Sequence, residues 1–428
     1  MRLILSGLGS YGDVFPMIGL GAAMQRRGHG VTLLANPYFR SNVESAGLTL
    51  APFSTEAEYL RLTQEPDLWR PRGGMQVIFR ESMQQLRPLV EQVRGMVASS
   101  SEPAVLVAHP LDMASRIVSE QLGTPLVAVA YAPMALWSRQ SPPRLAGVWV
   151  GRGTPKWLLD AQFWLGEKLL VEPTVRRPLN LLRAELGLPP IGRVFPEWWY
   201  RADHVLGLFP EWFATASGED LPGDWPQNLT LAGFPFWDGP IPADGAQRPP
   251  LPAEVEAWLA SGDRPIVFAP GTANRAAGPF FRAAIDACAR LGRRGVLLTK
   301  YAEQLPDPLP DHVRSFEFVP LSLLLPRCAA LVHHGGIGTT SQGLAAGIPH
   351  LVQPMGFDQP DNAERLAHLG VGDSLRPARF TGARVAARLD ALLSSRTVPK
   401  ACGRLAERCR ENDPFAAACL CLESLAGS

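Results

Sequence analysis

The sequence predicts an α/β protein in which two doubly wound parallel sheets form separate domains. Short, nearly continuous apolar segments alternate with helix-like segments through the first half of the chain, as expected for strands buried on both faces. The same alternation starts again at Pro265. Between the two series, residues 238–255 are rich in proline, glycine and alanine, which is typical of a linker. A chain of 428 residues is long enough for two domains with sizeable cores.

The first series supplies the strands of one sheet. They are expected at residues 2–9, 30–36, 104–108, 126–130, 205–209 and 229–235. Helices are expected over 16–28, with Pro16 in the first turn, and over 115–123. Residues 137–200 break the alternation and are rich in proline, tryptophan and arginine. Their aromatic side chains are interpreted as core and loop anchors or, alternatively, as the lining of a large apolar pocket.

The second series supplies the other sheet. Its strands are expected at residues 265–271, 295–300, 313–320, 329–334 and 348–354, with helices over 280–292 and 339–347. We therefore expect one domain over residues 1–240 and a linker over 241–252. A second domain follows over 253–410, and a tail helix over 411–428 can cross back to the first domain.

Composition excludes several classes of function. The formal net charge of +1 gives no electrostatic reason to bind nucleic acid or a strongly anionic surface. The six cysteines fit no zinc pattern and are expected to be reduced thiols. No apolar run reaches the ~18 residues that a spanning helix needs. We expect a cytoplasmic protein, at most peripheral to the inner membrane.

The loop after the first strand carries Gly7, Gly9 and Gly12, a G-x-G-x-x-G pattern. That pattern alone is a weak sign of nicotinamide binding. The acid expected about 20 residues later to bind the ribose is missing, and Asp13 would repel a pyrophosphate. Because ligands gather at the carboxyl edge of open sheets, we interpret Asp13 as a catalytic base. A helix cap is the competing interpretation of Asp13.

The stretch from His333 to Leu366 indicates an anion site followed by a hydroxyl-binding pair. His333, His334, Gly336, Gly338 and Thr339 form a turn and the start of a helix, where imidazole, amide and hydroxyl groups suit a diphosphate. A metal site is disfavoured because no third ligand is spaced nearby. Thr272, after the strand 265–271, can serve the same diphosphate or lie in an ordinary turn. Asp358 and Gln359, expected on an exposed loop, suit the hydroxyl groups of a sugar.

Phe318 and Val319 lie ahead of the next strand. The ring can stack on a nucleobase while the Val319 backbone reads its edge. A buried phenylalanine in the core is the competing interpretation.

With these residues in place, the chain resembles glycosyltransferase family 1, the UDP-glycosyltransferase-like enzymes. The signature of that family is matched at His334, Gly336, Gly338, Thr339, Pro349, Asp358, Gln359 and Asn362. The N-terminal GSYGDVFP resembles the branch with Gly-Asp-Val in its first loop, and within that branch the sequence is most similar to the catalytic rhamnosyltransferases of rhamnolipid biosynthesis. The resemblance implies a GT-B fold, with two Rossmann-like domains facing across a cleft. The first would bind the acceptor and the second the nucleotide-sugar donor, for an inverting transfer without metal or cofactor.

Two departures from the family pattern sharpen this expectation. Where many UDP-sugar enzymes have a glutamate for both ribose hydroxyls, this chain has Gln342, which favours a deoxyribose donor such as dTDP-L-rhamnose. The usual base is a histidine activated by an aspartate, whereas Asp13 has no obvious partner. His109 ends the strand 104–108 and can reach the cleft, but we expect it to take no part.

The resemblance implies a 3-hydroxyacyl lipid acceptor, giving a mono-rhamnolipid, with peripheral membrane association or a partner acyltransferase. Its pocket is expected at Trp69, Phe79, Trp137 and Trp198. Another donor with a natural-product or sterol acceptor is the closest alternative. A sugar-nucleotide epimerase would need carboxylates flanking C2 of the sugar, and none are evident. A silent sugar-nucleotide-binding partner is disfavoured by the intact Asp13, His334 and Asp358.

Overall fold

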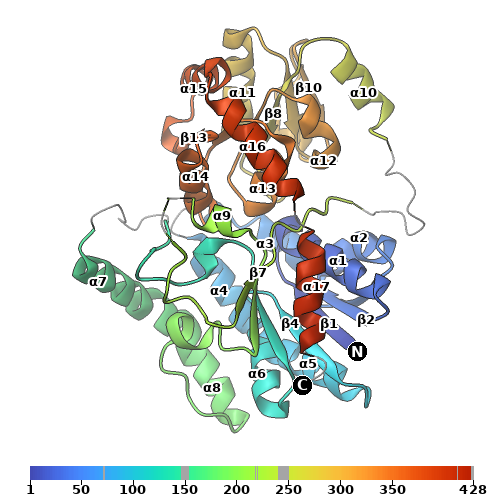
Figure 1. Cartoon of the computed structure of the whole chain (residues 1–428), viewed down its shortest axis with the longest axis vertical. Helices are drawn as coiled ribbons and strands as arrows, with labels where there is room; N and C mark the ends of the chain where they lie inside the picture. The colour runs from blue at the N-terminus through green and yellow to red at the C-terminus, as the bar shows by residue number, and fades with distance from the viewer. Residues whose placement is uncertain are drawn as a thin grey trace.

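The computed structural model consists of two α/β domains stacked along the long axis of the molecule (Figure 1). It describes the chain except for residues 71–72, 146–153, 217, 219, 240–249, 412 and 426–428. The first domain carries the blue to green part of the chain and the second the yellow to red part. The predicted α/β class with two Rossmann-like domains is confirmed. Among the described residues, none of the helices has the length and hydropathy of a bilayer-spanning segment.

Each domain is built around one parallel sheet. In the described residues, the first sheet has the strand order β3-β2-β1-β4-β5-β6-β7 and the second β10-β9-β8-β11-β12-β13. The strands of the first sheet are β1 (Arg2–Gly7), β2 (Gly30–Ala35), β3 (Thr49–Pro52), β4 (Ala104–Ala108), β5 (Leu126–Ala130), β6 (His204–Gly207) and β7 (Leu229–Leu231). Those of the second are β8 (Ile266–Ala269), β9 (Gly295–Leu298), β10 (Val313–Phe316), β11 (Ala330–His333), β12 (His350–Val352) and β13 (Gly372–Ser374).

Both sheets reverse their strand order beside the first strand of the domain. The reversal lies between β1 and β4 in one sheet and between β8 and β11 in the other. In open α/β sheets, ligands bind outside the carboxyl ends of the strands at this switch point. The topology therefore predicts one ligand site in each domain, built from the residues that follow these four strands.

The helices cover both faces of each sheet. In the first domain they are α1 (Tyr11–Arg26), α2 (Arg40–Ser45), α3 (Glu56–Thr63), α4 (Gly74–Gln84), α5 (Leu86–Ala98), α6 (Met113–Leu122), α7 (Lys156–Gly166), α8 (Arg177–Glu185) and α9 (Glu211–Ala214), with a π-helical segment η4 (Glu167–Arg176) between α7 and α8. In the second they are α10 (Ala253–Ala260), α11 (Gly278–Leu291), α12 (Leu321–Leu324), α13 (Ile337–Ala346), α14 (Gln359–His368), α15 (Gly382–Ser394) and α16 (Val398–Arg410). Successive strand residues such as Leu3 and Ile4 belong to different apolar clusters, because their side chains point to opposite faces of the sheet.

Helix α1 begins earlier than the sequence predicted. The expected start near Pro16 is wrong, because the helix already begins at Tyr11 and Pro16 lies inside it. Ser10 and Asp13 form a capping box that satisfies free backbone donors of the first turn. This cap lies ahead of the proline and sets the start of the helix.

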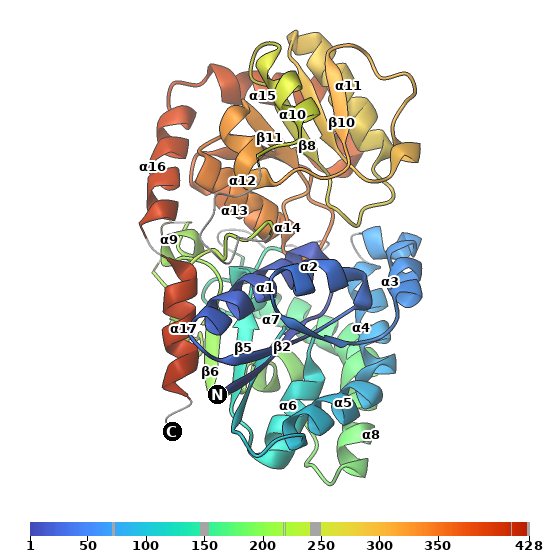
Figure 2. The ribbon, with the colours of Figure 1, turned by 90° about the vertical axis from the view of Figure 1, so that its right-hand side faces the viewer.

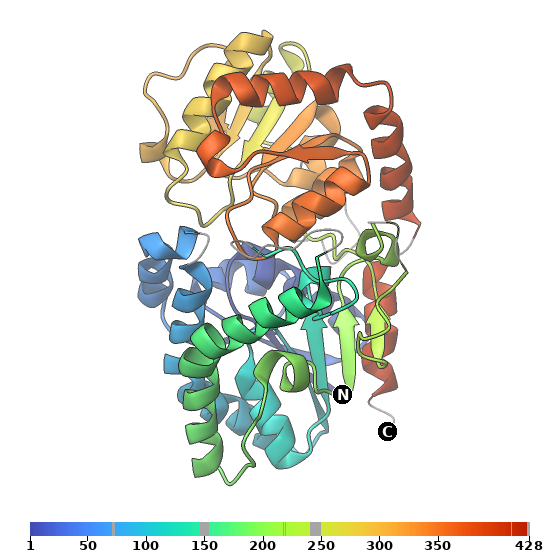
Figure 3. The ribbon, with the colours of Figure 1, turned by 90° about the vertical axis from the view of Figure 1, so that its left-hand side faces the viewer.

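The last helix, α17 (Pro414–Ser424), belongs to the second half of the sequence but packs on the first domain (Figures 2 and 3). Phe415 lies against α1 so closely that a Cβ at Gly19 would come within 2.5 Å of its ring. Glu423 accepts hydrogen bonds from Arg27 and lies 3.0 Å from the His29 ring. The tail thus fastens the end of the chain to the first domain.

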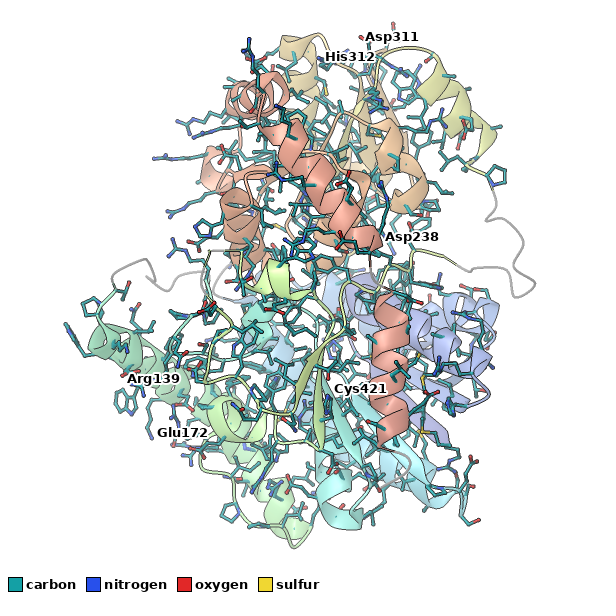
Figure 4. The ribbon with its side chains drawn as sticks, viewed as in Figure 1. Arg139, Glu172, Asp238, Asp311, His312 and Cys421 are labelled. Carbon is teal, nitrogen blue, oxygen red and sulfur yellow. The ribbon has the colours of Figure 1, made fainter. Side chains whose placement is uncertain are left out.

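The junction between the domains also contains direct polar contacts. Asp238, labelled in Figure 4, accepts hydrogen bonds from the backbone N–H and the hydroxyl of Ser322, at 2.7 and 3.0 Å. The expected linker, residues 241–252, falls largely outside the described residues. Apolar residues of both domains, among them Phe213 and Leu405, share one buried cluster. The two domains therefore pack directly on each other.

Candidate active site

A cavity of about 1630 Å³ lies between the carboxyl ends of the two sheets. Its walls come from both domains, including the loops after β1, β4, β8 and β11. Both switch points thus open into the same space. The cavity lining includes most of the predicted site residues: Asp13, Thr272, His334, Gly336, Gly338, Thr339, Phe318, Val319, Gln342, Asp358 and Gln359.

Asp13 lies in the first turn of α1 and faces the cavity, with about a third of its side chain exposed. Its Oδ2 accepts hydrogen bonds from the N–H and hydroxyl of Ser10, at 2.7 and 3.0 Å. The Tyr131 hydroxyl donates to the Asp13 carbonyl at 2.8 Å. The capping interpretation is therefore correct for Oδ2, while Oδ1 has a different partner.

His109 is the partner of that second oxygen. Its Nε2 lies 3.2 Å from Asp13 Oδ1, while its Nδ1 accepts the backbone N–H of Leu111 at 3.0 Å. The acceptor role of Nδ1 assigns the ring proton to Nε2, which therefore donates to Asp13. Our expectation that His109 takes no part was wrong. The chain has an aspartate–histidine pair in which the acid faces the cavity and the histidine lies behind it, almost fully buried.

The close approach of these groups depends on the glycine before them. Gly9 has a φ of +144°, and a Cβ at this position would lie 2.3 Å from Asp13 Oδ2. A side chain would therefore clash with the carboxylate and strain the backbone. Gly9 makes room for the carboxylate of Asp13, so this glycine of the G-x-G-x-x-G pattern has a role that needs no dinucleotide.

In the second domain, His334 follows β11 and lies beside the loop after β8. A Cβ at Gly336 would lie 2.5 Å from its Nε2, so only glycine allows this ring position. Burial lowers the pKa of His334 to about 4, although the carbonyl of Ala269 favours the protonated form. His334 is therefore neutral at pH 7 and carries one ring N–H, which either the Ala269 carbonyl or an anion in the cavity can accept.

His333 points away from the cavity, so its predicted role as a diphosphate ligand is wrong. Its side chain is fully buried, with Nδ1 accepting the N–H of Gly335 and Nε2 lying 3.1 Å from His350 Nδ1. Successive residues of a strand point to opposite faces, which separates the two histidines. No group of three His, Cys, Asp or Glu side chains suited to a metal ion occurs in the described parts of the chain.

The N-terminus of α13 presents free backbone donors to the cavity. Gly338 and Thr339 lie in its first turn and Thr272 lies on the loop after β8, and all three line the cavity. A Cβ at Gly338 would contact nothing within 4 Å, so its peptide is open to a ligand. A helix N-terminus favours an anion. Their role as diphosphate ligands stays a prediction.

Asp358 and Gln359 lie at the start of α14 and not on an exposed loop, so that expectation was wrong. Asp358 Oδ2 accepts from the N–H of Ile337 at 3.1 Å and from Asn362 at 2.7 Å, and Gln359 Oε1 accepts from the N–H of Met355 at 2.8 Å. Burial raises the pKa of Asp358 to about 7, against the effect of these donors, and the charge of Asp13 raises it further. The two acids thus interact across the cavity.

The predicted nucleoside residues line the same cavity. Phe318 is 50% exposed, so the alternative of a buried core residue is wrong, whereas Val319 is buried. Gln342 lies on α13 and is largely buried. Their roles toward a nucleoside stay predictions.

Two of the four predicted acceptor residues line the cavity, namely Phe79 and Trp137. Trp198 does not, because its indole N–H donates to Glu120 and its ring packs beneath Arg183. Its neighbour Trp199 lines the cavity instead. Trp69 ends a short 3₁₀ turn, and its side chain lies outside the described residues.

Two Rossmann-like domains sharing one cavity, with an acid on one side and an anion-binding turn on the other, define the GT-B class of glycosyltransferases. A family model described as glycosyltransferase family 28 N-terminal domain matches residues 3–136. A second, described as erythromycin biosynthesis protein CIII-like, C-terminal domain, matches residues 284–417. Glycosyltransferase GtfC of Amycolatopsis orientalis is 31% identical over 389 residues, covering 88% of this chain and 86% of its own. The chain belongs to this family of GT-B glycosyltransferases and is an enzyme of that class.

Solved structures agree with the fold over the full chain. The glycosyltransferase of kitacinnamycin superposes with a TM-score of 0.73 at 20% identity, covering 99% of this chain and 98% of its own. The spinosyn rhamnosyltransferase SpnG gives 0.65 at 21% identity, covering 99% and 100%. VinC in complex with dTDP gives 0.64 at 22% identity and covers both chains fully. None of these matches carries the expected closer likeness to rhamnolipid rhamnosyltransferases, which stays a prediction.

Proposed function

We propose that the enzyme transfers L-rhamnose from dTDP-L-rhamnose to a hydroxyl group of an apolar lipid, with inversion at the anomeric carbon. The observation that carries the proposal is the placement of Asp13 and the α13 turn on opposite sides of one cavity. An acceptor bound to the first domain and a donor bound to the second would meet between them.

In the proposed reaction, Asp13 takes the proton of the acceptor hydroxyl while its oxygen attacks the anomeric carbon. The bond between that carbon and the diphosphate breaks in the same displacement, and the diphosphate leaves with one more negative charge. His334, Thr272, Thr339 and the amides of α13 would stabilise that charge. His109, donating to Asp13, would hold the carboxylate toward the acceptor.

The donor assignment is supported by Gln342. A neutral amide is a poorer partner than a carboxylate for the two ribose hydroxyls of a UDP-sugar. The binding of dTDP by VinC and the name of SpnG, a spinosyn rhamnosyltransferase, are consistent with a dTDP-linked deoxysugar. Replacing Gln342 with Glu should shift the ratio of kcat/KM toward UDP-sugars, measured with both donors side by side. An unchanged ratio would argue against this role of Gln342.

The acceptor assignment is supported by the apolar wall of the first domain. Phe79, Trp137, Phe195, Trp199 and Leu170 line the acceptor side of the cavity. The outer surface of α7 and η4 also carries exposed apolar side chains, since Trp157 is 71% exposed and Leu169 is 69% exposed. Helix α7 lies at the outside of the molecule (Figure 1). Since Leu169 of η4 also lines the cavity, a lipid acceptor could pass from a membrane surface along α7 and η4 into the cavity. Peripheral membrane association, or delivery by a partner acyltransferase, belongs to this proposal.

A natural-product acceptor is the second candidate, because the matching C-terminal family model is named for erythromycin biosynthesis. The deciding experiment incubates the protein with dTDP-L-rhamnose and, in parallel, a 3-hydroxyacyl lipid or a macrolide aglycone. Release of dTDP and a rhamnosylated lipid is the expected result. Transfer to the aglycone alone would replace the lipid assignment. Binding of donor without release of dTDP in any arm would contradict the transfer.

A further inference from the structure

The described lining of the cavity is acidic and contains a single lysine or arginine. Its acidic residues are Asp13, Glu58, Glu81, Glu167, Asp238, Glu317 and Asp358, the last with its pKa raised to about 7, and the one cation of this kind is Lys300. His334, with its pKa lowered to about 4, adds no charge at pH 7. A diphosphate entering this space would therefore meet one full positive charge.

Lys300 lies where a diphosphate ligand is expected. Strands β8 and β9 are parallel neighbours, with Phe268 opposite Leu297. Two residues beyond the ends of these strands come Gly271 and Lys300, both at the carboxyl edge of the sheet and both in the cavity lining. The strand ends themselves are neighbours, about 4.8 Å apart, a spacing that a lysine side chain can cross. Lys300 is thus within reach of the Gly271-Thr272 turn.

The ammonium group of Lys300 is held by aromatic residues of the first domain. It donates to the Tyr38 hydroxyl and lies 4.5 Å from the centre of the Tyr38 ring and 5.7 Å from that of Tyr11. The Tyr301 ring of its own domain is 5.4 Å away. Aromatic faces stabilise a cation without neutralising it. An ammonium group has three donors, so further N–H groups remain for an anion.

Burial lowers the pKa of Lys300, while the charge of Glu317 opposes the shift. A group desolvated in this way gains more from a nearby anion than an exposed lysine does, because the local dielectric is lower. Its Tyr11 contact also reaches the first turn of α1, two residues from Asp13. The ammonium group therefore lies beside the helix that carries the acid, while its backbone follows the strand next to β8.

We propose that Lys300 binds the diphosphate of the sugar nucleotide and stabilises the charge that develops on it as the sugar leaves. This inference rests on the proposed function only in that the donor is a nucleoside diphosphate sugar. It does not depend on rhamnose or on the nature of the acceptor. Lys300 is then a donor-site residue that lies outside the His333–Leu366 signature.

The test is calorimetric titration of the full chain with dTDP and, separately, with thymidine. Lys300→Met removes the charge at nearly constant length and should weaken dTDP binding roughly 10- to 100-fold, as expected for hydrogen bonds to a charged group. Thymidine binding should not change. Lys300→Arg should restore dTDP binding to within a few-fold. Lys400→Met, which removes an exposed lysine on α16, is the matched control and should behave like wild type.

Two results would overturn the proposal. One is an equal loss of dTDP and thymidine binding in Lys300→Met, and the other is no loss of either. Tyr38→Phe removes the hydroxyl that holds Lys300 but keeps the cation. If it weakens dTDP binding as much as Lys300→Met does, Lys300 acts as a tie between domains and the proposal fails.

Lys300→Gln provides a second uncharged variant should the methionine variant not fold, as judged by its thermal unfolding. The same titrations with UDP and uridine separate this inference from the donor assignment. Wild-type protein that binds UDP but not dTDP would contradict the dTDP assignment alone. Lys300 would then be tested by the difference between UDP and uridine.

Discussion

The two switch points of this enzyme share a topology but differ in chemistry. In the first domain, Asp13 follows β1 and His109 follows β4, and a hydrogen bond joins them. In the second, Thr272 follows β8 and His334 follows β11, among glycines and next to the start of α13. One pair offers a carboxylate to the cavity, the other offers hydrogen-bond donors. The same strand order thus yields a base or an anion site according to the residues that follow two strands.

The largest expected effect comes from the acid of the first switch point. Asp13→Asn should lower kcat roughly 10²- to 10⁴-fold, because general-base help is lost. Donor affinity, measured by titration with dTDP, should stay within a few-fold of wild type. Ser10→Ala is the control, since it removes one contact of the capping box and keeps the base. Near wild-type turnover in Asp13→Asn would contradict the assignment of Asp13 as the general base.

The second switch point contains adjacent histidines that should respond in opposite ways. His334→Ala should reduce kcat/KM for the donor roughly 10²-fold, as loss of an oxyanion donor does. His333→Ala should leave nucleotide affinity unchanged and lower the melting temperature, because it removes the buried contact with His350. Steady-state kinetics and thermal unfolding of both variants check this. Equal effects of the two on donor binding would contradict their different roles.

His109 should have a smaller effect than Asp13, since it acts through the acid. We expect His109→Asn to lower kcat roughly 10- to 100-fold, the value of a hydrogen bond to a charged group. His109→Gln should retain more activity, because its amide can donate from about the position of Nε2, whereas Asn replaces only Nδ1. The two kcat values, and the pH profile of each variant, are the measurement. A ranking of Asn above Gln would exclude donation to Asp13 as the role of His109.

A separate expected effect, on stability and not on turnover, is the pH dependence introduced by Asp358. Its pKa is raised to about 7 in the folded protein from an ordinary value of 3.8. Between these values the folded protein keeps a proton that the unfolded chain has lost, so this contribution stabilises at low pH and is lost as the pH rises through about 7. Relative to Asp358→Asn, wild type should lose up to about 1.4 kcal/mol per pH unit across that window. Denaturant unfolding from pH 5 to 8 measures it, and a pH-independent difference would contradict the raised pKa.

Much of the fold was predictable from the sequence because its central strands are buried on both faces. The strands at 104–108 and 126–130 have the predicted bounds. Edge strands β3 and β13 were missed, since Thr49–Pro52 and Gly372–Ser374 lack a run of buried apolar residues. Local pattern carries little information where tertiary pairing alone makes a strand.

The candidate site was predicted less evenly. Residues of one contiguous motif, such as His334 and Thr339, were predicted together and do line the same cavity. The histidine that pairs with Asp13 was missed, because it lies 96 positions away in the sequence. No spacing rule links two such positions. The strand order does, since β1 and β4 are neighbours, and a polar residue ending each of them would have marked His109. Trp198 and Trp199 show a second limit, because sequence alone does not say which of two adjacent aromatics faces a cavity.

The return of α17 to the first domain has a mechanical consequence. The main chain passes from one domain to the other twice, once after Asp238 and once between α16 and α17. Two covalent connections restrict the relative rotation of the domains more than a single linker would. The spacing between Asp13 and the α13 turn is therefore constrained by the chain itself as well as by side-chain packing.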